Sequence, residues 1–400
     1  MDIEQKSVTP KYVGTGGDIF KLSFVTGFLT FITFGIYRFW AKTRVRRFVW
    51  SSIKIGDDAV EYTGNGLEKF LGFLIAVVVL AIYLGILQVL LTFLGYNMFA
   101  TLTNQAITNV EVLAQIAVVY GVLIALIPLI LFAQYRGRRY MLSRTRWRGV
   151  RMGMTQGAWG YTFRALGYGL LMGLTLGILL PLNTYNLNKY MVDRTWFGDA
   201  KMEQGGKWTA LYPGLLHVAI AIGILIVGSI MMAAVPALGF VLLFVGYIWI
   251  IVGYVYYKVY AYRYLTSHQT LDDAVTFSAD TRTGEVIKTY ILGGLLVGLI
   301  SIAAFLPVGL IVAGAAAALG SGGTGGAFGV VILTIVAYLA ALTVIMAAYV
   351  ALVTQPILAH FVHTTTIHNT DHLDTIRQRA DDSIPDADGF ADALDVGGAF

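Results

Sequence analysis

Residues 46–66 read RRFVWSSIKIGDDAVEYTGNG, and this stretch contains the pattern that organises the chain. A cation–aromatic cluster, Arg46-Arg47-Phe48-Val49, ends one apolar segment. A turn at Gly56-Asp57-Asp58 follows, and alternating apolar and polar residues on both sides of it are typical of a β-hairpin. A second glycine-rich turn, Thr63-Gly64-Asn65-Gly66, precedes the next long apolar run. The stretch therefore predicts a polar hairpin module between two membrane helices.

The same pattern occurs five times along the chain. The other four clusters are Arg138-Arg139-Tyr140-Met141, Asn188-Lys189-Tyr190-Met191, Tyr262-Arg263-Tyr264-Leu265 and Ala359-His360-Phe361-Val362. The five modules are 41–67, 135–163, 186–210, 259–288 and 357–379. Internal self-similarity of this kind predicts a repeat-built architecture. Because an isolated hairpin is marginally stable in water, we expect several hairpins to associate into one small sheet.

Composition identifies the class of protein. Hydrophobic residues make up 57% of the chain and charged residues 13%, whereas a soluble domain has about 25% charged residues. Apolar runs long enough to cross about 30 Å of hydrocarbon occupy 70–94, 112–132, 215–232, 238–257, 291–319 and 330–353. Two shorter runs, 22–37 and 165–182, are ambiguous. The sequence predicts an all-α polytopic membrane bundle of about six full transmembrane helices, with two re-entrant or short membrane helices and small repeated cytoplasmic β-hairpin modules.

We expect residues 1–379 to form one integral membrane domain. Residues 380–400 contain six aspartates and no lysine or arginine, which predicts an acidic, disordered tail.

Charge placement predicts the topology. The loops at 95–110, 233–237 and 320–328 contain no lysine or arginine, whereas the modules contain 21 of the 28. If all eight apolar runs crossed the bilayer, the cations would divide about evenly between its two sides. If 22–37 and 165–182 instead dip in and return, every module lies on one side. The positive-inside rule favours the second arrangement, with the modules and both termini in the cytoplasm.

The two short runs resemble each other. Thr33-Phe34-Gly35-Ile36 matches Thr175-Leu176-Gly177-Ile178, and Gly27 falls where Gly169 does. With Gly173, the glycines Gly169 and Gly177 form a small-residue stripe. Two interpretations stay open for Gly27, Gly35, Gly169, Gly173 and Gly177. One is close helix packing in lipid, and the other is a broken or re-entrant helix beside a cavity.

The chain resembles the YjgN-like family of bacterial inner-membrane proteins, a family of unknown function. The resemblance rests on Gly14-Thr15-Gly16-Gly17-Asp18, on 29–41 and on 62–66, and length and span placement extend it over nearly the whole chain. The later copies are degenerate, since Leu180-Pro181-Leu182-Asn183 replaces the Tyr-x-x-Trp stretch of the first module. The resemblance implies an inner-membrane location. It implies no established activity, so no functional residue is carried over.

Catalytic motifs are missing from the sequence. It has no His-Glu-x-x-His, phosphate-binding loop or nucleophile elbow. We therefore predict no catalytic residue, no enzymatic activity and no cofactor.

The basic clusters have two interpretations. They are topology anchors, or they form a site for an anionic lipid headgroup or small anion. Each cation near an anionic membrane surface contributes about 1 kcal/mol, so anionic phospholipids are expected partners. Nucleic acid is not an expected partner, because these charges are dispersed beside the bilayer. The candidate residues are Arg44, Arg46, Arg47, Arg136, Arg138, Arg139, Arg144, Lys189, Arg194 and Arg263.

Four of the six histidines lie in the fifth module: His360, His363, His368 and His372. Imidazoles and nearby carboxylates are ligands that Zn²⁺ prefers. We predict a polar, partly exposed module without a metal and keep a metal site as the alternative.

Two functions remain open. One is transport, or lipid or anion handling, through a helix-bundle cavity with a basic cytoplasmic mouth. The other is a non-transporting scaffold whose cytoplasmic hairpin sheet binds a protein partner, and a homo-oligomer is possible in either case. The apolar runs contain no acidic or basic residue at their centres, which argues against an ion-coupled relay. An open cavity between the helices would favour the first function, and a solid bundle under an exposed sheet the second.

Overall fold

Six helical spans confirm the polytopic membrane architecture. The computed structural model describes residues 6–97, 109–320 and 327–379, so the predicted acidic tail lies outside the described residues. The helical spans that are long and apolar enough to cross a membrane are Gly66–Phe93, Val112–Ser143, Trp208–Ala234, Pro236–Thr266, Thr283–Ala317 and Phe328–His363. These correspond to the six long apolar runs of the sequence.

The hairpins associate into one ten-stranded antiparallel sheet in which every strand pairs with its neighbours in the sequence. The strands are β1 (Lys11–Tyr12), β2 (Ile53–Ile55), β3 (Asp58–Tyr62), β4 (Thr145–Trp147), β5 (Val150–Met154), β6 (Thr195–Phe197), β7 (Ala200–Gln204), β8 (Gln269–Leu271), β9 (Val275–Ala279) and β10 (Thr365–His368). The sheet curls until its ends meet, because Val8 and Ile367 exchange two backbone hydrogen bonds of 2.8 and 2.9 Å. We call this closed sheet the ring.

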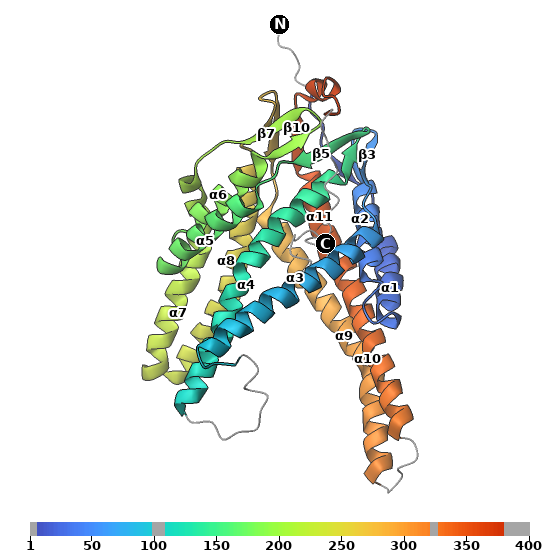
Figure 1. Cartoon of the computed structure of the whole chain (residues 1–400), viewed down its shortest axis with the longest axis vertical. Helices are drawn as coiled ribbons and strands as arrows, with labels where there is room; N and C mark the ends of the chain where they lie inside the picture. The colour runs from blue at the N-terminus through green and yellow to red at the C-terminus, as the bar shows by residue number, and fades with distance from the viewer. Residues whose placement is uncertain (1–5, 98–108, 321–326, 380–400) are drawn as a thin grey trace.

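Two kinds of connection alternate around the ring. Tight turns join β2 to β3, β4 to β5, β6 to β7 and β8 to β9, and helices join the remaining neighbours. The helices are α1 (Gly16–Ile32), α2 (Arg38–Ser51), α3 (Gly66–Phe93), α4 (Asn109–Ser143), α5 (Ala158–Leu174), α6 (Leu180–Val192), α7 (Leu216–Ala234), α8 (Pro236–Thr266), α9 (Thr283–Gly320), α10 (Ala327–Tyr349) and α11 (Gln355–His363). A 3₁₀ helix (Trp208–Leu215) precedes α7, and a π-helical turn (Val350–Thr354) joins α10 to α11. Since each pair of helices leaves the ring and returns to the adjacent strand, all helix pairs extend from one end of it (Figure 1).

The opposite end, which carries the tight turns, is the distal end of the ring. The interior holds a buried apolar cluster of Trp147, Phe197, Ala200, Leu271, Val275, Ile367 and Ile376. Ile376 belongs to the segment 370–379, which crosses the distal turns. There the amide of Asp199 donates to the carbonyl of Arg377, and the Arg377 amide donates to the Asp199 carboxylate, each at 2.9 Å. Arg148 bridges Asp58 and Asp374, and its hydrogen bond to Asp58 is the main cause that raises the Arg148 pKa.

The two ambiguous apolar runs form the tips of two helical hairpins, α1–α2 and α5–α6, whose helices are shorter than the spans. Their tips have the same conformation: Phe34 and Leu176 have φ of 51° and 52°, and the following Gly35 and Gly177 have φ of 90° and 89°. Their hydrogen bonds also match. The amide of Gly35 donates to Thr30 O at 2.7 Å, and that of Gly177 to Met172 O at 2.8 Å. Glycine is needed at both positions because its φ is in the left-handed region.

The long pairs pack unevenly. α7 and α8 approach closely through glycines, since a Cβ on Gly253 would lie 2.9 Å from the Val218 amide nitrogen. Elsewhere the pairs diverge below the ring (Figure 1), and only 11–17% of the most apolar part of each span is buried. The spans are therefore not a solid bundle.

Candidate functional site

The cation at the second position of three clusters binds its helix to the ring. Arg47 Nη2 donates to Gly64 O at 2.8 Å, Arg139 Nε to Met154 O at 3.0 Å, and Lys189 Nζ to Gln204 O at 2.7 Å. Met154 and Gln204 are the last residues of β5 and β7, and Gly64 lies just beyond β3. Three of the predicted headgroup residues thus bind backbone carbonyls at equivalent places. No sequence pattern marks these carbonyl acceptors, although 15 or 17 residues separate each cation from its acceptor.

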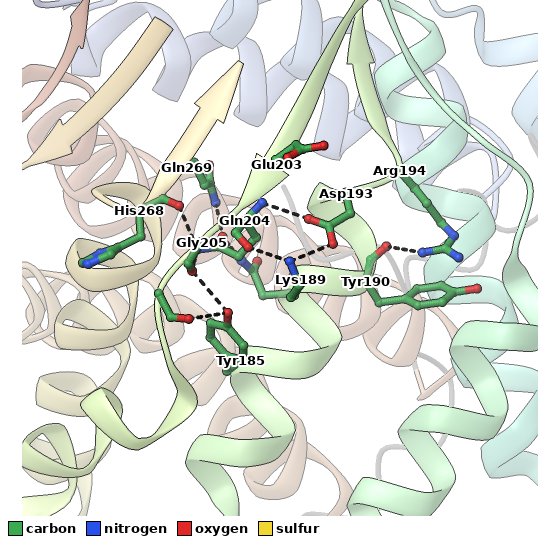
Figure 2. Close-up of polar contacts among 12 residues, drawn as sticks. Tyr185, Lys189, Tyr190, Asp193, Arg194, Glu203, Gln204, Gly205, His268 and Gln269 are labelled. Carbon is green, nitrogen blue, oxygen red and sulfur yellow. Dashed lines mark hydrogen bonds and ion pairs between the residues drawn. The ribbon is translucent and has the colours of Figure 1, made fainter. Parts of the chain in front are cut away.

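Gln204 lies at one such junction between a helix and a strand end, where its side chain makes several hydrogen bonds (Figure 2). Its side chain is buried, its amide nitrogen Nε2 donates to Leu265 O at 3.0 Å, and its Oε1 accepts from Asn188 and Gln269. Lys189 also pairs with Asp193 at 3.0 Å. The junction joins α6, β7 and β8, and it is a structural network.

In the third and fourth clusters, the third residue is a tyrosine that contacts the glycine-containing turn before the next helix. Tyr190 Oη donates to Gly157 O at 2.9 Å, and the Lys207 amide donates to Tyr264 Oη at 2.8 Å. A Cβ on Gly157 would lie 2.8 Å from the Tyr190 hydroxyl. A Cβ on Gly206 would lie 2.7 Å from the Tyr264 hydroxyl, so close contact with these two tyrosines explains the glycines at 157 and 206.

Two buried cations lie in the first module and directly after it. Arg46 and Lys69 are 1% and 0% exposed, and they lie 5.8 and 5.2 Å from the centre of the Tyr62 ring. Arg144 pairs with Glu68 at 3.1 Å beside them. Cation–π contacts of this kind stabilise buried cations. Positive charge is thus concentrated where α2, α3 and α4 meet the ring.

Two of the predicted residues line a cavity of about 360 Å³ between α4 and the start of α5. We call it the basic pocket. Its walls are Phe132, Tyr135, Arg136, Arg139 and residues 156–160. Trp159 is 57% exposed at its edge, and its ring centre lies 4.8 Å from that of Phe132. α5 begins here with no side-chain cap at its N-cap residue, Gly157. Trp159 was not among the predicted residues, although an aromatic residue two positions after Gly157 was a readable sign.

The remaining predicted cations are not brought to this pocket. Arg194 stacks on Tyr190 at 3.6 Å, and Arg138 lies near Tyr161 and Tyr135. Arg44 and Arg263 are exposed on α2 and α8. The ten candidates therefore form no single site.

The five glycines divide into three groups. Gly27 packs, because a Cβ there would lie 2.9 Å from Thr343 on α10. Gly169 and Gly173 have no neighbouring atom within 4 Å of a Cβ, so they mediate no close packing within the chain. Gly35 and Gly177 are turn residues, as described above.

The four histidines have four separate partners. His363 Nε2 accepts from the Tyr12 amide at 2.9 Å, and His360 Nε2 accepts from the Arg282 amide at 3.1 Å. His368 contacts Ser278, and His372 contacts Asp272. Within the described part of the chain, no three histidine or carboxylate side chains converge as a metal would require.

Comparison with known proteins identifies relatives. Residues 8–299 match the family described as "Bacterial protein of unknown function (DUF898)". The chain is 26% identical over 155 residues to the inner membrane protein YjgN of Salmonella typhimurium (strain LT2), which covers 38% of this chain and 33% of that protein. The match thus spans about a third of the relative's length. No solved structure matches the chain.

Proposed function

The chain belongs to the DUF898 family, and from that premise we propose that it is a multi-pass inner-membrane protein that binds anionic lipid headgroups at the basic pocket. The name of its relative YjgN supports the location. A small anion of the same chemistry, such as free phosphate, would use the same groups. The proposal includes no reaction and no cofactor.

We place the ring in the cytoplasm. The helix pairs all leave the same end of the ring, so the modules share one side of the membrane if the long pairs cross and return. Of the 28 lysines and arginines, 21 lie in these modules, and the positive-inside rule assigns the side that carries them to the cytoplasm. Similar hairpins at similar junctions also support descent of the modules from one repeated unit.

In this arrangement α1–α2 and α5–α6 are re-entrant. Their tips are apolar and unprotected, since Phe34 is 99% and Leu176 92% exposed. A phenylalanine and a leucine so exposed to water would cost about 1.5–3 kcal/mol each relative to burial. Insertion of both tips into the hydrocarbon removes that cost, and it leaves the start of α5 at headgroup level.

The observation that carries the headgroup proposal is the convergence of Arg136, Arg139 and Trp159 on one cavity. Arginine binds phosphate oxygens with two parallel hydrogen bonds. An exposed tryptophan beside it is typical of the membrane interface. The divergent spans also favour lipid handling over a solid bundle, in which no lipid would reach the interior.

Retention of lipid through purification tests the proposal. The wild type should retain phosphatidylglycerol in preference to phosphatidylcholine when native mass spectra are recorded from mixed nanodiscs. Arg136→Gln should lose that preference, whereas Lys54→Gln, the same charge change on an exposed strand residue, should keep it. Free phosphate that competes with the lipid would identify a small-anion site. Equal retention by both variants would contradict the proposal.

A scaffold function is the second candidate. The distal turns display the exposed carboxylates Asp57, Asp199, Asp272 and Asp273, which would suit a basic protein partner. A scaffold without a lipid site would retain the same lipids in Arg136→Gln as in the wild type.

A further inference from the structure

A second cavity, of about 570 Å³, lies at the helical end of the ring. We call it the lower cavity. α8, α9 and the continuous helix from α10 through α11 form its sides. Ile53 of β2, Thr365 of β10 and Pro10, which precedes β1, lie against it. Its volume is within the range of small-molecule and cofactor sites. It shares no lining residue with the basic pocket.

The walls of the lower cavity are apolar. One face of the helix supplies Val353, Ile357, Leu358, Phe361 and Val362. The polar side chains are only tyrosines and threonines, and none of the described lining residues is charged. Two of these hydroxyls, on Tyr262 and Thr365, bond each other at 2.7 Å. A charged or strongly hydrated ligand would therefore lose its water without compensation.

The π-helical turn lies directly at this cavity. Val353 and Thr354, which line it, belong to the turn, and Pro356 follows. Proline has no amide hydrogen, so the regular helical bonding is interrupted here, and π-helical turns occur frequently at functional sites. The turn is held from both sides. A Cβ on Gly293 of α9 would lie 2.5 Å from Leu352 O, and Gln355 Nε2 donates to Gly14 O at 2.8 Å.

The lower cavity opens towards the lipid. Tyr290 and Tyr349 line it and are still 43% and 47% exposed, so its edge is unsealed along α9 and α10. Both residues belong to the membrane-spanning helices. Tyrosines are enriched at the membrane interface, and the ligand that enters sideways at that level is a membrane lipid.

We propose that the lower cavity binds one hydrocarbon chain of a membrane lipid. The ring would hold the cavity open, and the π-helical turn would direct Thr354 towards the chain. The proposal stands independently of the basic pocket, because α4 and α5 supply none of the lining residues.

Photolabelling of the full-length protein tests this site. The protein is reconstituted in phosphatidylcholine that carries a diazirine in its acyl chain, irradiated, digested and analysed by mass spectrometry. We expect labelling of 353–362 to exceed, several-fold, that of 331–336 on the same helix, where Val331, Ile332 and Ile335 are exposed to bulk lipid. Equal labelling of the two segments would mean bulk lipid contact only and would overturn the proposal.

Variants give a second readout. Ile357→Trp fills the cavity and should remove the excess labelling, whereas Ile335→Trp, the same change on the exposed part of α10, should not. Ile357→Ala enlarges the cavity and should keep the excess, so a general loss of structure is recognised. If both Ile357 variants lose the excess labelling of 353–362 while their thermal stability is unchanged, the proposed lipid site is contradicted. Arg136→Gln should not affect this labelling, which separates its outcome from that of the headgroup proposal.

Discussion

The ring and the helix pairs below it are stabilised in different ways. In the ring, ten strands are paired in order, the interior is filled by buried side chains, and cations from the helices bind the strand ends. In α3, by contrast, the last buried residue is Ala76, although the helix continues to Phe93. Protein contacts thus hold the ring together, and the lower spans depend on lipid for the burial of their apolar surface.

The largest expected effect is in the ring's interior. Trp147→Ala removes a side chain that is 7% exposed and contacts Phe197, so it should lower the free energy of unfolding by about 3–5 kcal/mol. Ile82→Ala on α3, where the side chain is 59% exposed, should change it by less than about 0.5 kcal/mol in detergent. Denaturant unfolding followed by circular dichroism measures both. Similar losses would remove the distinction between the regions.

Substitution of two glycines, one on a closely packed helix and one on a loosely packed helix, compares the packing of the two helices. Gly253→Ala places a methyl group against the Val218 amide of α7 and should cost about 1–3 kcal/mol through overpacking. Gly85→Ala on α3 meets no atom within 4 Å and should instead stabilise by about 0.5–1 kcal/mol, because alanine favours the helix. Thermal unfolding midpoints that move in the same direction for both would be the contrary result.

The cations that bind the helices to the ring give a smaller effect. Lys189→Met leaves Gln204 O and Asp193 without their charged partner. Because the Lys189 side chain is 43% exposed, a loss of about 0.5–1.5 kcal/mol in the free energy of unfolding is expected. Lys54→Met on the exposed face of β2 is the matched control and should cost little. If Lys189→Met is as harmless as the control, the junction in Figure 2 contributes nothing to stability.

The smallest energetic effect is expected at the tips of the short hairpins. Phe34→Cys and Leu176→Cys remove side chains that touch little of the protein, so unfolding in detergent should barely change. A spin label on either cysteine should nevertheless be more accessible to oxygen than to a water-soluble nickel complex, as for a residue in lipid. An accessibility like that of a label at Asp57 would place the tips in water.

Local sequence patterns predicted much of this fold, and they failed where partners are distant or belong to the backbone. The hairpin arms and the six spans follow from turn residues and long apolar runs. The closure of the ring does not, because it joins Val8 to Ile367 through a single bridge with no periodic pattern around it. The length of the run 22–37 did not show whether it crosses the membrane. The reversal of chain direction between α1 and α2 depends on the left-handed turn at Phe34 and Gly35. At the site, the sequence identified Arg136 and Arg139 among ten candidates, but no residue pattern marks a carbonyl acceptor such as Met154 O.

The most direct test of the one-sided architecture is cysteine labelling in cells, because the chain has no cysteine of its own. Single cysteines replace Asp57, Asp199 and Asp273 in three distal turns, and Val235 in the loop between α7 and α8. A membrane-impermeant maleimide added outside the inner membrane should label only the cysteine at 235, and the other three should react only after permeabilisation. Labelling of positions 199 and 273 from outside, with 57 protected, would show that the short hairpins cross the membrane and would contradict the account.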